Sequence, residues 1–559
     1  MPLTDRRAFM AYCSTLGLGA TLFPAALWSR LAAGATISVD TVRCAEEIAG
    51  LTFAPDQREM MVEELNEQAK QLQALRSVRL PNEIPPALHF DPVLPGMRVE
   101  PGPGKRERSR VRVPAVSANL EELAFLPLTT LSELVRRKKV TSLQLTRMYL
   151  DRLRRYDPTL KCVVTFTQER ALQQARAADE EIRRGKYRGP LHGIPWGAKD
   201  LLATKGYPTT WGTGPFKEQV IDTDATVVQR LDAAGAVLIA KLTLGELAYG
   251  DVWFGGMTRN PWKTDQGSSG SSAGPASATA AGLVGFSIGS ETLGSISSPS
   301  TRCGTTGLRP TFGRVPRTGA MALSWSMDKL GPICRSVEDC ALVLEAIAGP
   351  DGHDLTVRDL PFAWDVTRPL RSIRIGYVKS AFDADHPTKK WDDAALDVVR
   401  RLGVPLMPVE IPDMPYSAIR PVLTVEAAAA FDELTRSGRD KEMTRQTKQA
   451  WPNLFRAARF IPAVEYVNAN RLRTMAMQKW AELMRTVDVI VAPTFGPQLL
   501  ATNLTGHPAV ILPNGFRDDG TPVSLTFVGG LYQEATLCAV AHAYQQATTF
   551  HLSHPSLKV

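Results

Sequence analysis

The sequence predicts an α/β protein in which helices cover a β-sheet. Helix-like and strand-like segments alternate along the chain: residues 224–234 have apolar positions at helical spacing, Gly235 follows as a stop, and residues 236–240 form a short apolar run typical of a buried strand. The composition, 44% hydrophobic and 22% charged over 559 residues, is that of a globular protein with a large core. Alternating helices and strands bury their apolar faces by layering helices on a sheet.

Residues 126–559 are predicted to form one large domain, because this stretch contains no internal repeat and no second Pro/Gly-rich break. Residues 96–125 are Pro/Gly-rich and charged, and we interpret them as a linker. Before the linker, residues 36–95 are predicted to form a helical extension. In its first part acidic, Gln and Leu residues recur at helical spacing, and five prolines between positions 81 and 95 then impose an extended tail.

The charge pattern argues against nucleic acid as a partner. The formal net charge is +8, from 65 basic and 57 acidic residues distributed along the chain. The basic residues are not interleaved with aromatic residues in the way that is typical of nucleic-acid-binding segments. We therefore predict no nucleic-acid partner and interpret the excess of basic over acidic residues as a bias of the protein surface.

The first 35 residues are predicted to be an export signal. Arg6 and Arg7 precede a weakly apolar stretch over residues 8–28, and residues 33–35 offer a cleavage site of small residues. The pattern resembles a twin-arginine signal, which implies the twin-arginine export machinery as a partner and a periplasmic or secreted location. A single membrane anchor is the alternative, but polar residues and Pro24 make this stretch a poor spanning helix. If the segment is not a signal, the expected location is the cytoplasm.

Two passages of the predicted domain contain the candidate functional residues. They are GPLHGIPWGAKDLLATKG, residues 189–206, and NPWKTDQGSSGSSAGPASATAAGLVGFSIGSETLGSISSPSTRCGTTGLRPT, residues 260–311. The second passage holds a Ser/Gly loop, a helix-compatible run to Ala281, a short strand over residues 284–288 and another Ser/Gly loop. A flexible linker would not enclose such a helix-strand unit, so two hydroxyl-rich loops are expected at its ends. Glycines there let backbone NH groups approach a substrate closely.

Both passages resemble the signature strings of the amidase signature family, G-I-P-x-G-x-K-D and, further on, P-G-G-S-S-G-G-S followed by G-T/S-D-x-G-G-S-I-R. Lys199 closes GIPWGAK, and the serine strings align with SGSSAGPA and GSETLGSIS. Alignment on the flanking NPW and AAGLV places the two serines of the family at Ser271 and Ser295, which are 24 residues apart as the motif requires; Ser268 would give 27. The likeness covers essentially everything from residue 126 onward. It implies a twisted central mixed sheet with helices on both sides.

The resemblance implies a serine amide hydrolase that acts on a small-molecule amide with no metal and no cofactor. A serine hydroxyl needs a base that is unprotonated near neutral pH, and burial can lower the pKa of a lysine far enough. The apolar residues 194–198 before Lys199 predict that it is buried. We therefore expect Lys199 to be the base, Ser271 to carry the proton, and Ser295 to form an acyl-enzyme that water releases. Ser272 is expected to support this network.

The resemblance also implies a cis peptide bond before Ser271 and an oxyanion hole formed by the backbone NH groups of Thr292, Leu293, Gly294 and Ser295. Three residues depart from the family strings: Leu293 replaces a glycine, Ser297 an arginine and Glu291 an aspartate. The NH donors survive a leucine unless its position needs a positive φ. Loss of the arginine removes a support of the loop, for which Arg302 is the candidate replacement.

Two alternatives to a working hydrolase stay open at this point. The departures in the second serine string leave room for a catalytically impaired, amidase-like binding protein. The stretch from residue 42 to residue 78 resembles the small C subunit of bacterial glutamyl-tRNA amidotransferases, and an amidotransferase A-like subunit in the cytoplasm is the other alternative. A plain amphipathic helical pair predicts the same geometry for that stretch. The sequence does not choose among amide and ester substrates, and a homo-oligomer is possible.

Overall fold

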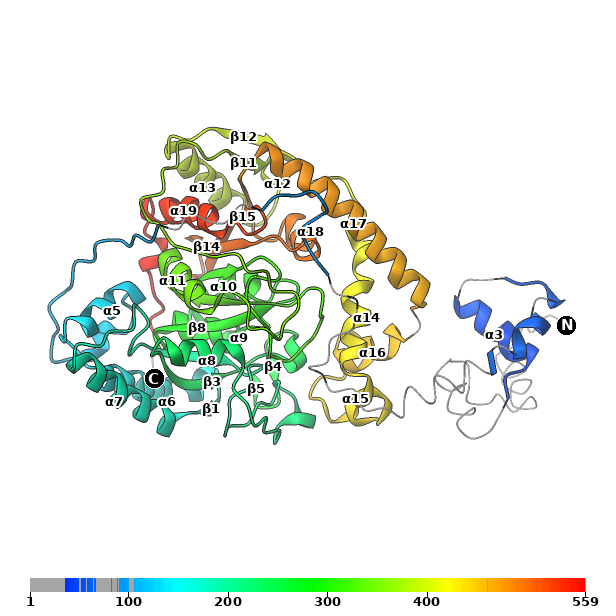
Figure 1. Cartoon of the computed structure of the whole chain (residues 1–559), viewed down its shortest axis with the longest axis horizontal. Helices are drawn as coiled ribbons and strands as arrows, with labels where there is room; N and C mark the ends of the chain where they lie inside the picture. The colour runs from blue at the N-terminus through cyan, green and yellow to red at the C-terminus, as the bar shows by residue number, and fades with distance from the viewer. Residues whose placement is uncertain are drawn as a thin grey trace.

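The computed structural model describes residues 36–49, 52–56, 58–63, 65–66, 82, 88, 90–99, 105–459 and 461–557. Within these ranges the chain forms an 11-stranded mixed sheet, with helices above and below it (Figure 1). The predicted α/β fold, with a central mixed sheet covered by helices, is therefore confirmed. The predicted domain boundaries stay predictions.

The strands of the sheet do not follow one another in space as they do in sequence. Their spatial order is β1 (Val163–Phe166), β3 (Val237–Leu242), β2 (Pro195–Lys199), β8 (Phe286–Glu291), β10 (Lys329–Cys334), β9 (Thr306–Arg309), β14 (Ala509–Phe516), β15 (Pro522–Gly529), β13 (Val489–Pro493), β11 (Ile375–Val378) and β12 (Leu406–Val409). Strand β2 is parallel to both of its neighbours, β3 and β8. Parallel strands end at the same edge of a sheet, so the carboxyl ends of β2 and β8 lie together.

The helices cover both faces of the sheet, as alternate side chains of β10 show. Ile333 packs with residues of α9 and α10 in one apolar cluster, whereas Leu330 and Cys334 belong to the main core together with residues of α11 and α19. Successive side chains of a strand point to opposite faces, so the two helix pairs lie on opposite sides. The helices of the domain are α5 (Leu128–Arg136), α6 (Ser142–Leu160), α7 (Gln168–Arg183), α8 (Thr226–Ala233), α9 (Ala273–Ala280), α10 (Ser297–Cys303), α11 (Val337–Ile347), α12 (Lys379–Asp383), α13 (Lys389–Arg401), α14 (Pro421–Ala430), α15 (Asp432–Arg436), α16 (Trp451–Ala458), α17 (Ala463–Thr486), α18 (Gln498–Thr505) and α19 (Glu534–Gln546).

The segments that the sequence pattern singled out form the expected elements. Helix α8 ends before Gly235, whose φ of 80° is left-handed, and β3 follows. The helix-strand unit between the two serine-rich loops is α9 followed by β8. Strand β8 begins at Phe286 and reaches Glu291, later and longer than the predicted strand over residues 284–288, because its pairing with β10 continues to the partners Glu291 and Lys329.

The N-terminal extension contains helix α3 (Val39–Ala49) and further helical residues between positions 55 and 66. Ile37 and Val42 form a small apolar cluster with Met61 and Leu65. The proposed export signal, residues 1–35, lies outside the described residues. The predicted linker lies partly against the domain, since Glu107 forms a β-bridge with Asp365 and residues 123–124 are buried in the core.

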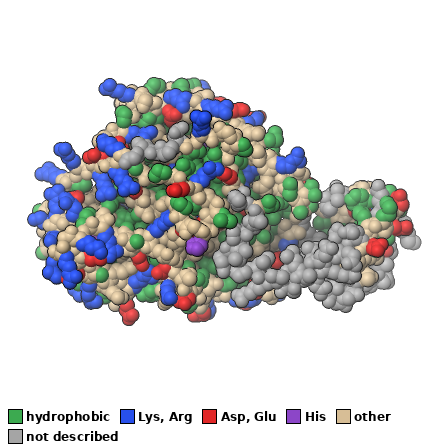
Figure 2. Space-filling model, in the orientation of Figure 1, with side chains coloured by type: hydrophobic (Ala, Val, Ile, Leu, Met, Phe, Trp, Pro, Cys, Tyr) green, Lys and Arg blue, Asp and Glu red, His purple; other side chains and the backbone are tan. Residues whose placement is uncertain are grey.

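The described part of the chain contains no helix that is both long and apolar enough to cross a membrane. On the face shown in Figure 2, Lys and Arg side chains are most numerous over the end of the domain that α5, α6 and α7 form. Several of these cations are paired locally: Arg136 and Arg137 with Glu133, and Arg183 and Arg184 with Glu180.

Candidate active site

Lys199 is the last residue of β2, at the sheet edge where β2 and β8 end together. Its Nζ atom lies 2.8 Å from Ser271 Oγ, 3.0 Å from Ser272 Oγ and 2.9 Å from Ser290 Oγ. Ser290 belongs to β8, so the parallel pairing brings it to the lysine. The amine is therefore held by three hydroxyls from two separate segments.

The environment of Lys199 is dry and lacks a partner of opposite charge. The side chain is 0% exposed, and among the described residues no carboxylate lies within ion-pair distance of its Nζ. Burial lowers the pKa of Lys199 well below its ordinary value, although the charges of Asp328 and Glu291 act in the opposite direction. The predicted burial is thus present, and it favours the neutral amine.

Ser271 and Ser272 lie at the start of α9, where the backbone makes a sharp turn. The peptide bond between Gly270 and Ser271 is cis, as the family resemblance implied. A Cβ atom on Gly270 would lie 1.8 Å from the carbonyl oxygen of Gly250, so only glycine fits before the serine. Ser272 Oγ also accepts a hydrogen bond from Ser290 N at 3.1 Å, which ties this turn to β8.

The alternative serine, Ser268, lies away from the lysine network. Its Oγ donates to the carbonyl oxygen of Ser269 at 2.9 Å, and no contact with Lys199 is present among the described residues. The geometry therefore places Ser271 beside Lys199.

Ser295 lies in the turn between β8 and α10, next to the other serine-rich loop. Its backbone carbonyl accepts a hydrogen bond from Ser272 N at 3.1 Å, which brings the two loops into contact. Ser295 retains 9% exposure, whereas Ser271 is 1% exposed. Within the described ranges the Ser295 hydroxyl makes no hydrogen bond. Ser295 is thus the more accessible of the two serines, as a group that meets a substrate must be.

The backbone NH groups of residues 292–295 have no hydrogen-bond acceptor in the part of the chain that the structure describes. Gly294 has a φ of 85°, whereas Leu293 is not among the residues with positive φ. The leucine therefore occupies a position that any L-residue tolerates, and the glycine that the turn requires is retained. The predicted oxyanion loop keeps its free NH donors despite the departure at Leu293.

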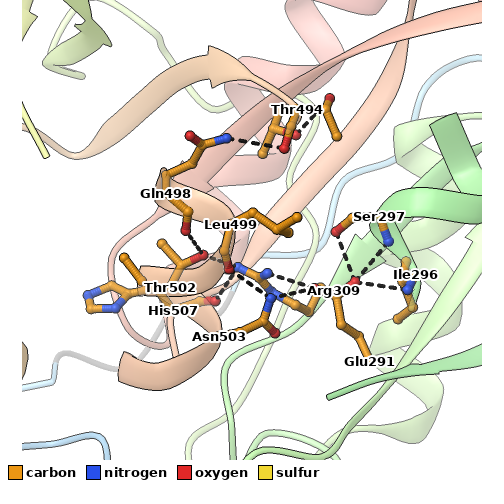
Figure 3. A network of polar contacts seen from close by, with 12 residues as sticks. Glu291, Ile296, Ser297, Arg309, Thr494, Gln498, Leu499, Thr502, Asn503 and His507 are labelled. Carbon is orange, nitrogen blue, oxygen red and sulfur yellow. Dashed lines mark hydrogen bonds and ion pairs between the residues drawn. The ribbon is translucent and has the colours of Figure 1, made fainter. Parts of the chain in front are cut away.

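The buried carboxylate of Glu291 binds the backbone that follows this loop (Figure 3). Glu291 Oε2 accepts hydrogen bonds from Ile296 N, Ser297 N and Ser297 Oγ, each at 2.8 Å. Its other oxygen accepts from Arg309 Nη1 and Asn503 Nδ2, also at 2.8 Å. Burial acts to raise the pKa of Glu291, but the Arg309 guanidinium, the charge of Lys329 and the hydrogen bond from Ser297 N together lower the pKa to about 2. The carboxylate is therefore charged and fully hydrogen bonded.

The expected role of Arg302 is wrong. Arg302 is exposed on α10 and donates to Gln266, because its position on the helix turns it away from the sheet. Arg309, on β9, supplies the guanidinium instead and is 1% exposed.

Sequence reasoning did not identify Ser290 or Asp328 as supporting residues. Ser290 lies inside the string GSETLGSIS, so that motif contained its signal, whereas Asp328 lies beyond the two passages that hold the candidate residues. Asp328 Oδ1 accepts from Thr292 Oγ1 at 2.6 Å and so supports the oxyanion loop. Asp200, the residue after the lysine, forms a buried ion pair with Lys241 at 2.7 Å, and nothing in the sequence indicated this pair.

An apolar pocket of about 290 Å³ opens beside the oxyanion loop. Ser290 and Thr292 line its inner end. Its walls are mostly apolar and come from several loops, with Leu201, Ala248, Met321, Leu323, Trp325, Leu330 and Leu355 among the lining residues. A substrate bound here would present its reacting group to the serine loops.

Comparison with known proteins decides the family. A family model described as amidase matches residues 144–500. The A subunit of the glutamyl-tRNA(Gln) amidotransferase of Methylococcus capsulatus is 35% identical over 479 residues, which cover 76% of this chain and 98% of that protein. The chain belongs to the amidase signature family. This amidase is an enzyme that hydrolyses carbon–nitrogen amide bonds.

Solved structures agree with this assignment. The peptide amidase of Stenotrophomonas maltophilia has a TM-score of 0.67 and 30% identity to this amidase, over 76% of this chain and 97% of that one. A bacterial aryl acylamidase of the amidase signature family shares the fold, with a TM-score of 0.69 at 23% identity over 76% and 98% of the two chains.

Replacing Arg309 tests how Glu291 and Arg309 support the turn that carries Ser295. Arg309→Leu leaves Glu291 as a buried charge without its ion-pair partner, which we expect to lower the free energy of unfolding by about 3 to 5 kcal/mol. Arg302→Leu removes an exposed arginine and is the matched control, with an expected change within about 0.5 kcal/mol. Urea denaturation followed by circular dichroism measures both. Equal stability of the two variants would contradict the role of Arg309.

Proposed function

We propose that this amidase cleaves a small-molecule carboxamide through an acyl-enzyme on Ser295, releasing a carboxylate and ammonia or an amine. The contact between Lys199 Nζ and Ser271 Oγ carries the proposal: it is 2.8 Å long and buried, and no carboxylate among the described residues pairs with the lysine. A lysine in this environment is a base that needs no histidine and no metal. Lys199, Ser271 and Ser295 have the same roles in this proposal as in the prediction from the sequence.

In the acylation step, Ser295 Oγ attacks the amide carbonyl carbon. Its proton passes to Ser271, whose own proton passes to the neutral amine of Lys199. The carbonyl oxygen becomes an oxyanion and accepts hydrogen bonds from the free NH groups of residues 292–295. When the carbon–nitrogen bond breaks, the proton returns from Lys199 through Ser271 to the departing nitrogen, and the acyl group remains on Ser295.

In the second step, water attacks the ester carbonyl of the acyl-enzyme. The same relay takes the proton of the water and returns it to Ser295 Oγ as the ester bond breaks. The product is a carboxylic acid, which ionises at neutral pH. Ser272 and Ser290 hold the lysine amine in place during both steps, since each lies within 3.0 Å of it.

The contacts of the loop favour turnover over an impaired binding protein. Leu293 needs no unusual backbone conformation, and the Ser297 hydroxyl and NH both donate to Glu291. The two departures that motivated the impaired alternative therefore leave the loop supported.

We also propose that residues 1–35 direct export through the twin-arginine machinery to the periplasm or the medium. The paired Arg6 and Arg7, the apolar stretch and the small residues at 33–35 support this proposal. The second candidate is one component of an amidotransferase, and it is kept because this chain is 35% identical to the A subunit of one. The two candidates differ in where the chain is found.

Substitution of the serines and the lysine tests the mechanism. Ser295→Ala and Lys199→Met remove the nucleophile and the base, and each is expected to lower kcat by about 10⁴-fold or more. Ser268→Ala is the control, because this hydroxyl does not touch the lysine. Ammonia release from a panel of simple amides, from acetamide to benzamide, provides the rates. Full activity of Ser295→Ala would overturn the acyl-enzyme.

The pH dependence of kcat/KM reports the state of Lys199. The base works only as the neutral amine, so activity rises with pH as the lysine loses its proton. Because burial lowers the pKa of Lys199, we expect the midpoint below the value of about 10.4 of an exposed lysine. At pH values between the lowered pKa of Lys199 in the folded chain and its ordinary pKa in the unfolded chain, only the unfolded chain carries the lysine proton. The free energy of unfolding, compared with that of Lys199→Met, therefore rises with pH in this range. A midpoint at the ordinary lysine value contradicts the proposed base.

Cell fractionation tests the location. The unsubstituted chain is expected outside the cytoplasm as a species that starts near Thr36, and the double variant Arg6→Lys, Arg7→Lys at full length in the cytoplasm. Arg43→Lys, beyond the segment, is the control. Mass spectrometry of the N-terminus identifies each species. Full-length unsubstituted chain in the cytoplasm would reject export and favour the amidotransferase component.

A further inference from the structure

The outer wall of the apolar pocket includes residues from the N-terminal extension. Asn82 and Leu88 line the pocket together with residues of the 317–330 and 353–356 segments. We call the described residues Asn82, Leu88 and 90–99 the arm. The family match begins at residue 144, so the arm lies outside the matched region.

The arm is held against the domain by specific contacts at Asn82 and at Phe90, before and after Leu88 in the chain. The Asn82 side chain accepts from Ala322 N at 2.7 Å and donates to Ala322 O at 2.9 Å, which pairs it with the backbone between two pocket residues. The Phe90 ring packs edge-on against Phe312, with 5.1 Å between centroids, and the Arg473 guanidinium lies 3.5 Å from the Phe90 centroid. These contacts seat Leu88 between two anchored points.

An ion pair also ties the arm to the chain just beyond the pocket segment 353–356. Asp91 pairs with Arg358, two residues after the pocket segment 353–356. Arg473 links Phe90 of the arm to the pocket. Its guanidinium donates to both the carbonyl and the hydroxyl of Ser326, which is next to Trp325 of the pocket. The arm and the pocket wall therefore form one connected unit.

The charged groups of the pocket are already satisfied. Arg317 pairs with Asp354 at 2.9 Å, and its guanidinium also donates to the carbonyl of Trp325 at 2.6 Å. The Asp328 carboxylate accepts hydrogen bonds from Thr292 Oγ1 and from the NH groups of residues 323 and 324. The remaining lining is mostly apolar, so the pocket suits an uncharged apolar group.

We propose that the arm is a specificity-determining part of the substrate site: it closes the outer wall of the pocket, and Leu88 sets the size of the apolar group that the amide substrate carries. The inference rests on the proposed amide hydrolysis. It assigns to the pocket the apolar part of the substrate and to the serine loops its carboxamide.

The test compares a small and a bulky amide, acetamide and 4-phenylbutanamide, with the full chain. Leu88 is 83% exposed, so its substitution leaves the folded core intact. Leu88→Ala removes apolar contact and Leu88→Trp obstructs the pocket, and each is expected to lower kcat/KM for 4-phenylbutanamide about tenfold while acetamide is unaffected. Asn82→Ala frees the arm and is expected to act like Leu88→Ala.

Val464 on α17 provides matched controls, because it is 66% exposed and lies outside the pocket. Val464→Ala and Val464→Trp are expected to keep the unsubstituted ratio of the two kcat/KM values. If the Leu88 variants also keep that ratio, the arm does not set specificity and the proposal is wrong.

A binding measurement separates this proposal from the proposed function. In the Ser295→Ala background, calorimetry is expected to show 4-phenylbutanamide binding about tenfold more weakly when Leu88→Trp is added. If the unsubstituted chain hydrolyses no amide but this binding difference is present, only the proposed function fails. If amides are hydrolysed and binding is equal with and without Leu88→Trp, only the role of the arm fails.

Discussion

The amine of Lys199 is buried where no carboxylate of the described chain reaches it, and the local structure keeps it both dry and hydrogen bonded. A buried polar group without partners would be costly, and three hydroxyls remove that cost without restoring the positive charge. The next residue, Asp200, carries a carboxylate that would stabilise the ammonium form. Lys241 and Thr210 engage that carboxylate instead, which separates the negative charge from the catalytic amine.

The second constraint is the turn that carries Ser295. A tight turn with several unpaired NH groups has few contacts of its own. Glu291, on the strand before the turn, holds it by accepting hydrogen bonds from Ile296 N and Ser297 N. The glutamate side chain, longer than the aspartate of the family string, contacts both the backbone after Ser295 and the guanidinium of Arg309. The guanidinium comes from β9, which is separated from β8 by β10, and not from position 297, where the family places an arginine. A serine is sufficient there because its hydroxyl also donates to the carboxylate.

The alternation of helix-like and strand-like segments predicted the fold class, and motif and spacing predicted that Lys199 and Ser271 belong to one site. These predictions were possible because each depends on a local pattern in the sequence. The supporting residues depend on which strands are neighbours. Arg309 meets Glu291 through the sheet, whereas Arg302 is nearer in sequence but lies on the outer side of a helix. The length of β8 was underestimated for the same reason, since its last residues are held by pairing with β10. Strand order and register are properties of the assembled sheet, which a local pattern does not contain.

The division of the site between two parts of the chain has a consequence for catalysis. Lys199, the serines and Glu291 all lie within the matched family region, whereas Leu88 and Asn82 contact the pocket from outside it. Contacts that are equally strong in the ground state and the transition state lower KM without raising kcat, whereas contacts that also orient the carbonyl raise kcat. Asp328 connects the pocket with the oxyanion loop, because it lines the pocket and also accepts a hydrogen bond from Thr292. A bulky group that displaced Asp328 would therefore also disturb Thr292 and the loop of residues 292–295 that it belongs to.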